Sequence, residues 1–315
     1  MPELRCGTRA WPVEAGSNLL DALNGAGLGV PYSCRAGHCQ ACLVRCTAGE
    51  PLDAQPEALT PERRAAGWRL ACQCRVVDDL AVETFDPLRD GAPARVARLD
   101  WPAGRVLRLW LEPERPLRYR PGQHLLLWTA AGVARPYSLA SLPGEEPWLE
   151  FHIDCSAPGA FSQAAQALQV GDELRLGALA SGALRYEPEW AAQPLWLLAG
   201  GTGLAPLWAL LRQALAAGHQ GPLRVLHASR EAHYLSEPLQ ALAAAHDNLQ
   251  VELLRREQLD AALAVPRLQA RQLRALVCGP PAFVEACSRR LYMQGVPRGQ
   301  ILADAFLTHA EAGQR

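Results

Sequence analysis

The stretch that decides the fold is Ser33-Cys34-Arg35-Ala36-Gly37-His38-Cys39-Gln40-Ala41-Cys42, and a fourth cysteine, Cys72, follows after a further 29 residues. Three cysteines spaced C-x₄-C-x₂-C with one distant cysteine have the spacing that holds a two-iron, two-sulfide cluster. Gly37 and the small Ala36 and Ala41 let the backbone come close to such a cluster, so that N–H groups can point at its sulfurs. The spacing therefore predicts one-electron chemistry on four ligands: Cys34, Cys39, Cys42 and Cys72.

Disulfides and a zinc site are the two alternatives for these cysteines. The first residues, Met1-Pro2-Glu3-Leu4-Arg5, lack an apolar signal segment, so we expect a cytoplasmic protein in a reducing setting that disfavours disulfides. Zinc ligands usually come as two C-x₂-C pairs, whereas Cys72-Gln73-Cys74 is C-x-C. Cys74 competes with Cys72 for the fourth position. The remaining cysteines are expected to be small packing residues: Cys6, Cys46, Cys74, Cys155 and Cys287.

Residues 1–86 as a whole resemble a plant-type ferredoxin domain. Leu19-Leu20-Asp21-Ala22-Leu23 is similar to its helix, and Asp78-Asp79-Leu80-Ala81-Val82-Glu83 is similar to its last strand. Leu70-Ala71-Cys72-Gln73 resembles the closing motif of that family, which selects Cys72 over Cys74. The resemblance implies a β-grasp-like [2Fe–2S] domain over residues 1–88.

Composition limits the partners. A length of 315 residues suggests two or three domains, and a hydrophobic content of 49% is ample for packed cores. The net charge of −1 gives no footprint for nucleic acid. The longest uncharged apolar stretch, Leu195 to Leu211, contains Gly200-Gly201-Thr202-Gly203 and Pro206, which a membrane helix would rarely combine. We therefore expect neither a nucleic-acid partner nor a membrane span.

The pattern of elements changes twice along the chain. Pro87, Gly91 and Pro93 predict a linker. Short strand-like runs such as 105–111 and 124–128 then predict an antiparallel β-barrel over 92–190, with one helix near 161–168. From Pro194 strands and helices alternate, which predicts a parallel sheet covered by helices over 194–315.

Two motifs in the middle region suit a flavin. In Arg135-Pro136-Tyr137-Ser138 an Arg can hold a phosphate, an aromatic ring can pack on a flavin, and a hydroxyl can reach flavin N5. Gly159-Ala160-Phe161-Ser162 opens an expected helix, where backbone N–H groups favour a pyrophosphate. Taken alone, the first motif also fits a strand with a surface Arg, and the second fits a simple helix cap.

Three features of the last region suit a nicotinamide nucleotide. Gly200-Gly201-Thr202-Gly203-Leu204-Ala205-Pro206 links a strand to a helix, so its glycines allow close approach to a diphosphate. Cys278-Gly279-Pro280-Pro281 ends a later strand. Arg230 follows the strand 223–228, where the ribose of the nucleotide is expected. The alternatives for the first two features are a tight strand-to-helix turn and a buried Cys before a turn, and Arg230 can accept a 2′-phosphate but is also compatible with NADH.

In this order the motifs resemble the ferredoxin–NADP reductase superfamily, whose members carry R-x-Y-S, G-x-x-S, G-x-G-x-x-P and C-G-P-P. Gly177-Ala178-Leu179-Ala180-Ser181-Gly182 departs from the family's G-P-x-G. The resemblance implies catalytic roles for Ser138 beside flavin N5 and for Cys278 near the hydride path. Phe306 covers the flavin ring or serves as ordinary packing. The implied cofactor contacts are Arg135, Tyr137, Ser138, Gly159 and Ser162 for FAD, and Gly201, Thr202, Gly203, Pro206, Arg230, Cys278, Gly279, Pro280 and Phe306 around the nucleotide and flavin.

The whole chain thus resembles the NAD(P)H-dependent reductase component of a multicomponent oxygenase. The resemblance implies electron transfer from NADH, with NADPH open, through FAD to a [2Fe–2S] cluster and on to an oxygenase. The alternatives are a reductase partner of a deoxysugar dehydratase and a non-enzymatic iron–sulfur redox sensor. The expected fold is a multidomain α+β and α/β protein with a β-grasp-like domain, an antiparallel barrel and a parallel-sheet domain.

Overall fold

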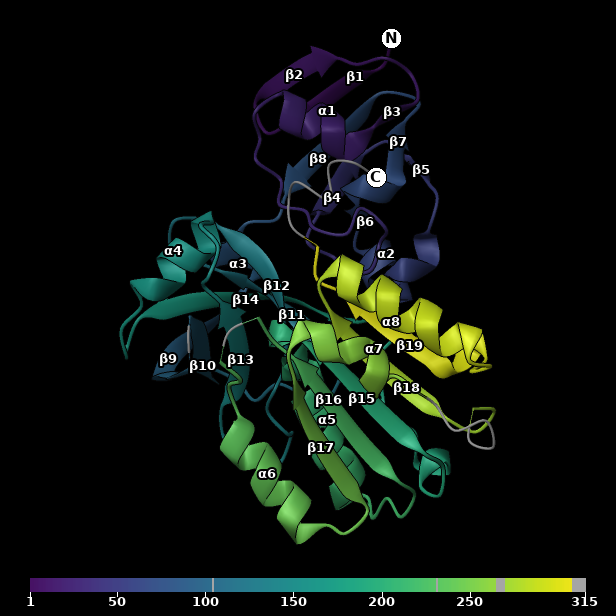
Figure 1. The fold of residues 1–315 in the computed structure, drawn as a ribbon. Helices are drawn as coiled ribbons and strands as arrows, with labels where there is room; N and C mark the ends of the chain where they lie inside the picture. Colours follow the sequence, from purple (N-terminus) through teal and green to yellow (C-terminus); the bar gives the residue numbers. More distant parts are fainter. Residues whose placement is uncertain (104, 231, 265–269, 308–315) are drawn as a thin grey trace.

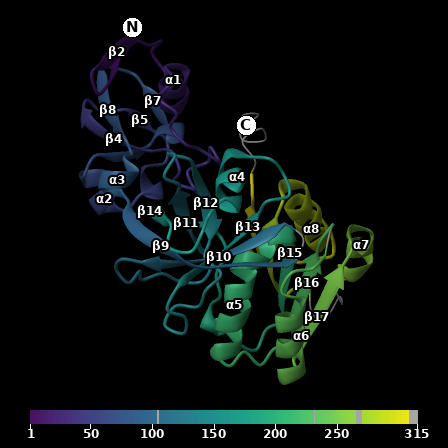
Figure 2. The same ribbon diagram turned by 90° about the vertical axis from the view of Figure 1, so that its left-hand side faces the viewer.

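The computed structural model describes residues 1–103, 105–230, 232–264 and 270–307. Three sheet-containing regions follow one another along the chain, and two views at right angles show them as separate bodies that touch (Figures 1 and 2). This arrangement confirms the predicted fold class. Among the helices of the described residues, none is both long enough and apolar enough to cross a bilayer.

The N-terminal region combines a mixed five-stranded sheet with a small three-stranded sheet. Its elements are β1 (Glu3–Cys6), β2 (Arg9–Pro12), β3 (Ser17–Asn18), α1 (Leu19–Gly25), β4 (Leu43–Ala48), β5 (Leu52–Asp53), η1 (Pro56–Ala58), α2 (Pro61–Ala65), β6 (Trp68–Leu70), η2 (Ala71–Gln73), β7 (Cys74–Val76) and β8 (Leu80–Thr84). The strand orders are β2-β1-β8-β4-β6 and β3-β7-β5. Helix α1 begins where the Asn18 side chain accepts the Asp21 N–H, and it buries Leu19, Leu20 and Leu23 against the sheet.

The predicted linker is more ordered than its composition suggests. Pro87 opens a short helix, α3 (Pro87–Asp90), because Asp86 accepts the Leu88 N–H and proline suits the first helical position. Pro93 already belongs to β9 (Ala92–Ala103), the first strand of the next region.

The middle region is an antiparallel barrel. Its further elements are β10 (Val106–Pro113), β11 (Gln123–Trp128), β12 (Ala134–Ser138), β13 (Leu149–Asp154), α4 (Ala160–Gln166), β14 (Glu173–Ser181) and η3 (Pro188–Trp190). The strand order is β12-β11-β14-β9-β10-β13, and β12 contacts β13, which closes the sheet. The stretch that departs from G-P-x-G runs mostly inside β14, where Gly177 leaves room for Leu126 and Trp128.

The C-terminal region is a parallel sheet between two helical layers. Its elements are β15 (Leu195–Gly200), η4 (Gly201–Gly203), α5 (Leu204–Ala216), β16 (Leu223–Ala228), α6 (Ser236–Ala245), β17 (Leu249–Leu254), η5 (Arg256–Gln258), α7 (Leu259–Ala262), β18 (Arg274–Gly279), α8 (Pro281–Met293), η6 (Arg298–Gln300) and β19 (Ile301–Ala305). The order is β17-β16-β15-β18-β19. Alternate residues of β15 pack on opposite faces, Leu197 with α5 and α6 and Leu198 with α7 and α8.

Candidate functional site

The loop that carries the first three cysteines turns its backbone N–H groups toward sulfur. The N–H groups of Ala36 and Cys39 each lie 3.3 Å from Cys34 Sγ. Arg35 and Gln40 take the left-handed backbone conformation, with φ of 51° and 52°, which lets successive N–H groups face inward. The loop is therefore built to stabilise negative charge on sulfur.

The four predicted ligands meet as two pairs. A hydrogen bond from the Cys39 thiol lowers the pKa of Cys34 to about 5, and nearby backbone N–H groups act in the same direction. The Cys42 thiol likewise lowers the pKa of Cys72, assisted by the Gly37 N–H. Two pairs of sulfurs suit two irons that take two thiolates apiece.

The described residues contain no group of three or more His, Cys, Asp or Glu side chains gathered closely enough to hold a single metal ion. Cys74 lies fully buried in the apolar core of the N-terminal region, where burial raises its pKa. All ten cysteines are free thiols.

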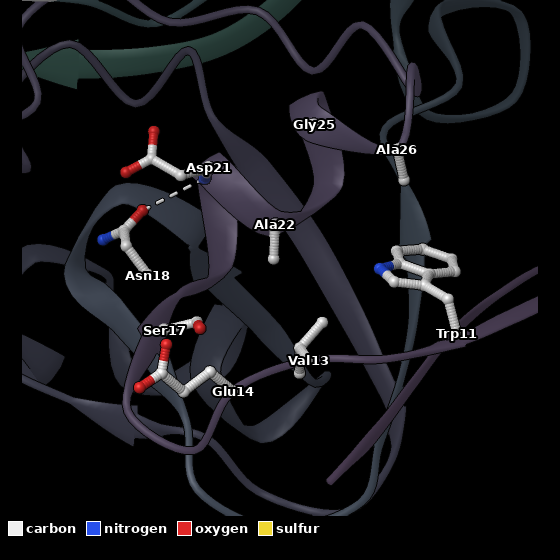
Figure 3. Close-up of a pocket in the computed structure, with 9 residues that line it drawn as sticks. All are labelled: Trp11, Val13, Glu14, Ser17, Asn18, Asp21, Ala22, Gly25 and Ala26. Atoms are coloured by element: carbon white, nitrogen blue, oxygen red, sulfur yellow. Dashed lines mark hydrogen bonds between the residues drawn. The ribbon is translucent and has the colours of Figure 1, made fainter. Parts of the chain in front are cut away.

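Helix α1 and its N-cap residue support the cluster loop, residues 34–42, through polar contacts. Asn18 Nδ2 donates to the Cys72 carbonyl at 2.9 Å, Asp21 pairs with Arg35, and Gln73 Nε2 lies 2.9 Å from the Arg35 carbonyl and 3.2 Å from Cys72 Sγ. Asn18 and Asp21 also line a surface pocket of about 440 Å³ beside α1 (Figure 3). The cluster loop is thus held by polar contacts from two elements distant in sequence.

The cluster loop packs against the outer face of β11. Leu126 and Trp128, two residues apart on this strand, pack against Cys39 and Ala41. The Trp128 ring stacks on Phe85 with a centroid separation of 5.6 Å and an interplanar angle of 14°. The predicted cluster therefore lies directly against the predicted flavin barrel.

His124 stands on the same face of β11, between the cluster loop and the other regions. It is buried, its Nε2 has no hydrogen-bond partner among the described residues, and burial lowers its pKa. The groups that influence its pKa include Asp304 of β19 and the backbone of Cys39. Across the strand pair His124 faces Ser138. All three regions meet at this side chain.

The Arg135-to-Ser138 motif forms β12. Arg135 is half-buried and its Nη1 donates to the Ala134 carbonyl at 2.7 Å, and no carboxylate of the described residues pairs with it. Tyr137 packs on Phe161 with ring centroids 4.9 Å apart, so β12 meets the second flavin motif. Ser138 is buried on the opposite face of the strand.

Gly159 is the residue before α4, as predicted from the sequence. The Ser162 hydroxyl lies 3.0 Å from the carbonyls of Ala157 and Gly159, so it braces this turn. A pocket of about 530 Å³ adjoins the motif and is lined by Trp101, Arg105, Cys155 and Gln166. Gln166 ends α4 and Cys155 directly follows β13, so this pocket lies beside these two elements.

The glycine loop, residues 200–203, and the Cys278 turn, residues 278–281, pack backbone against backbone. A Cβ added to Gly203 would lie 2.1 Å from the Cys278 carbonyl oxygen, and one added to Gly279 would lie 2.9 Å from the Gly200 carbonyl oxygen. Gly279 has a φ of 151°. Both turns stand at the carboxyl ends of adjacent parallel strands, the usual location of ligands in such sheets.

The other predicted nucleotide contacts are spread around this edge. Thr202 is half-buried, while Arg230 and Pro280 are exposed after β16 and β18. Pro206 is buried in the first turn of α5, where a missing N–H costs little. The Phe306 N–H donates to the Gly279 carbonyl at 2.9 Å, which places the C-terminal aromatic beside the Cys278 turn.

Sequence reasoning missed the residues that support these sites from a distance. Asn18, His124 and Trp128 carry no motif of their own, and Gln73 stands in the closing motif without any sign of its contact with Arg35. The only available signal was the two-residue period of side chains along a strand. This period places His124, Leu126 and Trp128 on one face of β11, but it does not show what covers that face.

Comparisons with known proteins agree with the three regions. Residues 6–77 match the 2Fe-2S iron-sulfur cluster binding domain, residues 102–186 the oxidoreductase FAD-binding domain, and residues 197–289 the oxidoreductase NAD-binding domain. These matches, with the sulfur pairs and the glycine loop, establish the cofactor set as a [2Fe–2S] cluster, FAD and a nicotinamide nucleotide.

Full-length relatives share the same order of domains. The ferredoxin–NAD(P)(+) reductase component of the naphthalene 1,2-dioxygenase and salicylate 5-hydroxylase systems of Ralstonia sp. is 33% identical over 93% of this chain and 94% of its own length. The corresponding component of the naphthalene 1,2-dioxygenase system of Pseudomonas putida is 30% identical over 95% and 96%. The crystal structure of the Amycolatopsis cytochrome P450 reductase GcoB, 26% identical, covers 97% of this chain and 99% of its own with a TM-score of 0.66. This chain belongs to the family of NAD(P)H-dependent flavin and iron–sulfur reductases that serve as reductase components of multicomponent oxygenase systems.

Proposed function

We propose that this protein takes electrons from NADH and delivers them singly to an oxygenase component through a cluster held by Cys34, Cys39, Cys42 and Cys72. The observation that supports this electron-transfer route is the packing of the cluster loop against β11, because β11 pairs with β12, the strand that bears the flavin motif. When bound, FAD accepts an electron pair as hydride and releases electrons singly to a [2Fe–2S] cluster.

The flavin contacts follow from β12 and the start of α4. Arg135, a half-buried cation without a carboxylate partner among the described residues, would hold a phosphate. Tyr137 would support the flavin from the barrel side, and Ser138 would offer its hydroxyl near N5. Gly159 and the turn braced by Ser162 would approach the pyrophosphate.

The nucleotide contacts follow from the edge of the parallel sheet. Gly201, Thr202 and Gly203 would approach the diphosphate, and Cys278, Gly279 and Pro280 would flank the nicotinamide. Cys278 is fully buried and burial raises its pKa well above the usual value, so it acts by shape and not as a thiolate nucleophile. Arg230 is exposed, so it fits either a ribose or a 2′-phosphate, and we propose NADH as the preferred donor with NADPH accepted.

The remaining assignments concern position in the cell and along the chain. We propose domains over residues 1–88, 92–190 and 194–315. None of the ten cysteines forms a disulfide, which suits the reducing cytoplasm, where we propose that the protein works.

An anaerobic titration tests the proposal. The purified protein is expected to show flavin and iron–sulfur absorption, and stoichiometric NADH should bleach both sets of bands together, with NADPH less effective at equal concentration. A colourless protein, or one whose bands do not respond to either nucleotide, would contradict the proposed function.

A pair of cysteine variants tests the ligand set. Cys72→Ser is expected to lose most of the iron–sulfur absorption, because one sulfur pair loses a ligand. Cys74→Ser is the matched control, since Cys74 lies in the apolar core, and it should keep the cluster. The reverse result would move the fourth ligand to Cys74.

A further inference from the structure

A chain of buried polar side chains joins the barrel to the C-terminal sheet. Glu150, His152 and Tyr234 are 1%, 3% and 2% exposed. His152 Nε2 lies 2.9 Å from Glu150 Oε1, and His152 Nδ1 lies 3.1 Å from the Tyr234 hydroxyl, across 82 positions of sequence. Arg108 closes the barrel end of the chain, with Nη2 2.6 Å from Glu150 Oε1.

The charges fix the direction of these hydrogen bonds. Burial alone would raise the pKa of Glu150, but His152 and Arg108 hold it below its usual value, so the group is a carboxylate. Burial lowers the pKa of His152, so its ring is neutral. A carboxylate can only accept, so His152 Nε2 carries the proton and donates to Glu150. His152 Nδ1 then accepts from the Tyr234 hydroxyl.

The chain continues to the glycine loop. The Tyr234 ring lies edge-on to His152 and also edge-on to His227, with centroid separations of 5.1 Å and 5.6 Å. His227 is fully buried, and its Nε2 lies 3.1 Å from the Gly201 carbonyl. A neutral His227 donates to that carbonyl, so strand β13 of the barrel is linked to the loop that opens α5.

This network is too deeply buried to touch a substrate, and burying four polar groups is costly unless they are fully paired. What it fixes is the position of Gly201 relative to the barrel. Hydride transfer depends on that geometry, since a misplacement of about 1 Å can cost about 100-fold in rate.

We propose that Glu150, His152 and Tyr234 are positioning residues that lock the glycine loop to the flavin barrel, so that the nicotinamide nucleotide meets the flavin in one geometry. This inference rests on the proposed function for its effect on hydride transfer, but the lock itself is a property of the polypeptide. It can therefore be tested with and without nucleotide.

The chain offers a matched pair of tyrosines for the test. The Tyr186 hydroxyl lies 3.1 Å from His219 Nδ1, and Tyr186 is also buried. His219 precedes β16 at the amino ends of the parallel strands, whereas His227 lies near the carboxyl end of β16, beside the glycine loop. Tyr234→Phe and Tyr186→Phe thus remove the same hydroxyl from the same kind of bond at opposite edges of one sheet.

The first measurement is amide hydrogen exchange on the complete protein without nucleotide. Tyr234→Phe is expected to speed exchange of residues 200–203 and 232–235 by about fivefold, the effect of one lost hydrogen bond, while Tyr186→Phe leaves those amides unchanged. The second measurement is the rate of flavin bleaching by NADH. Tyr234→Phe should slow it about tenfold or more with unchanged absorption spectra, and Tyr186→Phe should not.

Two histidine variants separate positioning from simple packing. His152→Gln offers an amide N–H to Glu150 and a carbonyl to Tyr234, so it should retain more of the bleaching rate than His152→Leu, which offers neither. Equal exchange and equal bleaching rates in the two tyrosine variants would overturn the proposal. A wild-type protein that NADH does not bleach would instead refute the proposed function, and the exchange measurement would still decide the inference.

Discussion

Gly203 gives the sharpest test of how the nucleotide edge is built. An added Cβ at this position would lie 2.1 Å from the Cys278 carbonyl oxygen, 2.4 Å from its carbon and 2.7 Å from the Gly279 nitrogen. All three neighbours are backbone atoms, so no side chain can turn aside to make room. Real Cβ contacts are essentially never under 3.0 Å and ordinary contact begins near 3.4 Å, so Gly203→Ala must drive the glycine loop and the Cys278 turn apart by about 0.9 to 1.3 Å.

The displacement has two expected consequences. Overpacking of this kind costs about 1–3 kcal/mol of the free energy of unfolding, and about 1 kcal/mol lowers Tm by several degrees in a domain of this size. A shift of about 1 Å between the diphosphate loop and the turn beside the nicotinamide is also expected to slow hydride transfer about 100-fold. The four cluster ligands lie in another region, so the iron–sulfur absorption should not change.

Thermal unfolding and stopped-flow bleaching of the flavin by NADH measure the two effects. Gly299→Ala is the matched control, because no atom lies within 4 Å of its added Cβ and its φ is not positive. The control should match the wild type in rate and should not lose stability. A Gly203→Ala protein with wild-type Tm and wild-type bleaching rate would show that the two turns are not packed as described.

Three further predictions concern two contacts between regions and one buried histidine. Trp128→Ala removes the ring stacked on Phe85, so the rate of cytochrome c reduction through the cluster should fall about tenfold or more. The rate of ferricyanide reduction by NADH should stay unchanged, and parallel losses with both acceptors would contradict this prediction. Arg212→Gln removes a side chain that donates to the Ala140 carbonyl and pairs with Glu146, and it should cost about 1–2 kcal/mol in denaturant unfolding, with no loss if the contact is not formed. Burial lowers the pKa of His227 to about 4, so the unfolded chain binds this proton more tightly than the folded protein does. The stability that a neutral His227 contributes is therefore full above about pH 6.5 and is lost, by about 3 kcal/mol, as the pH falls toward 4. His227→Asn should flatten this pH dependence when the free energy of unfolding is measured across the same range.

Much of the chemistry could be predicted because it is local in the chain. The Cys34-to-Cys42 loop, the Gly200-to-Pro206 turn and the Cys278-to-Pro281 turn each place their groups through a few consecutive residues. Strand–helix alternation after Pro194 likewise predicts a parallel sheet, because only a crossover can join parallel strands. The short helix at Pro87 was not predicted, since a proline that ends one element also suits the first turn of a helix.

The sequence by itself determined the ligand spacing, the order of the three regions and the glycines that two close backbone approaches require. Only the tertiary structure decided that Cys34 pairs with Cys39 and Cys42 with Cys72, that the outer face of β11 seats the cluster loop, and that His152 meets Tyr234. The physical reason is the separation along the sequence over which each kind of interaction acts. Backbone geometry and side-chain period act over a few residues, whereas these contacts join groups that come together only after separate cores have packed against each other.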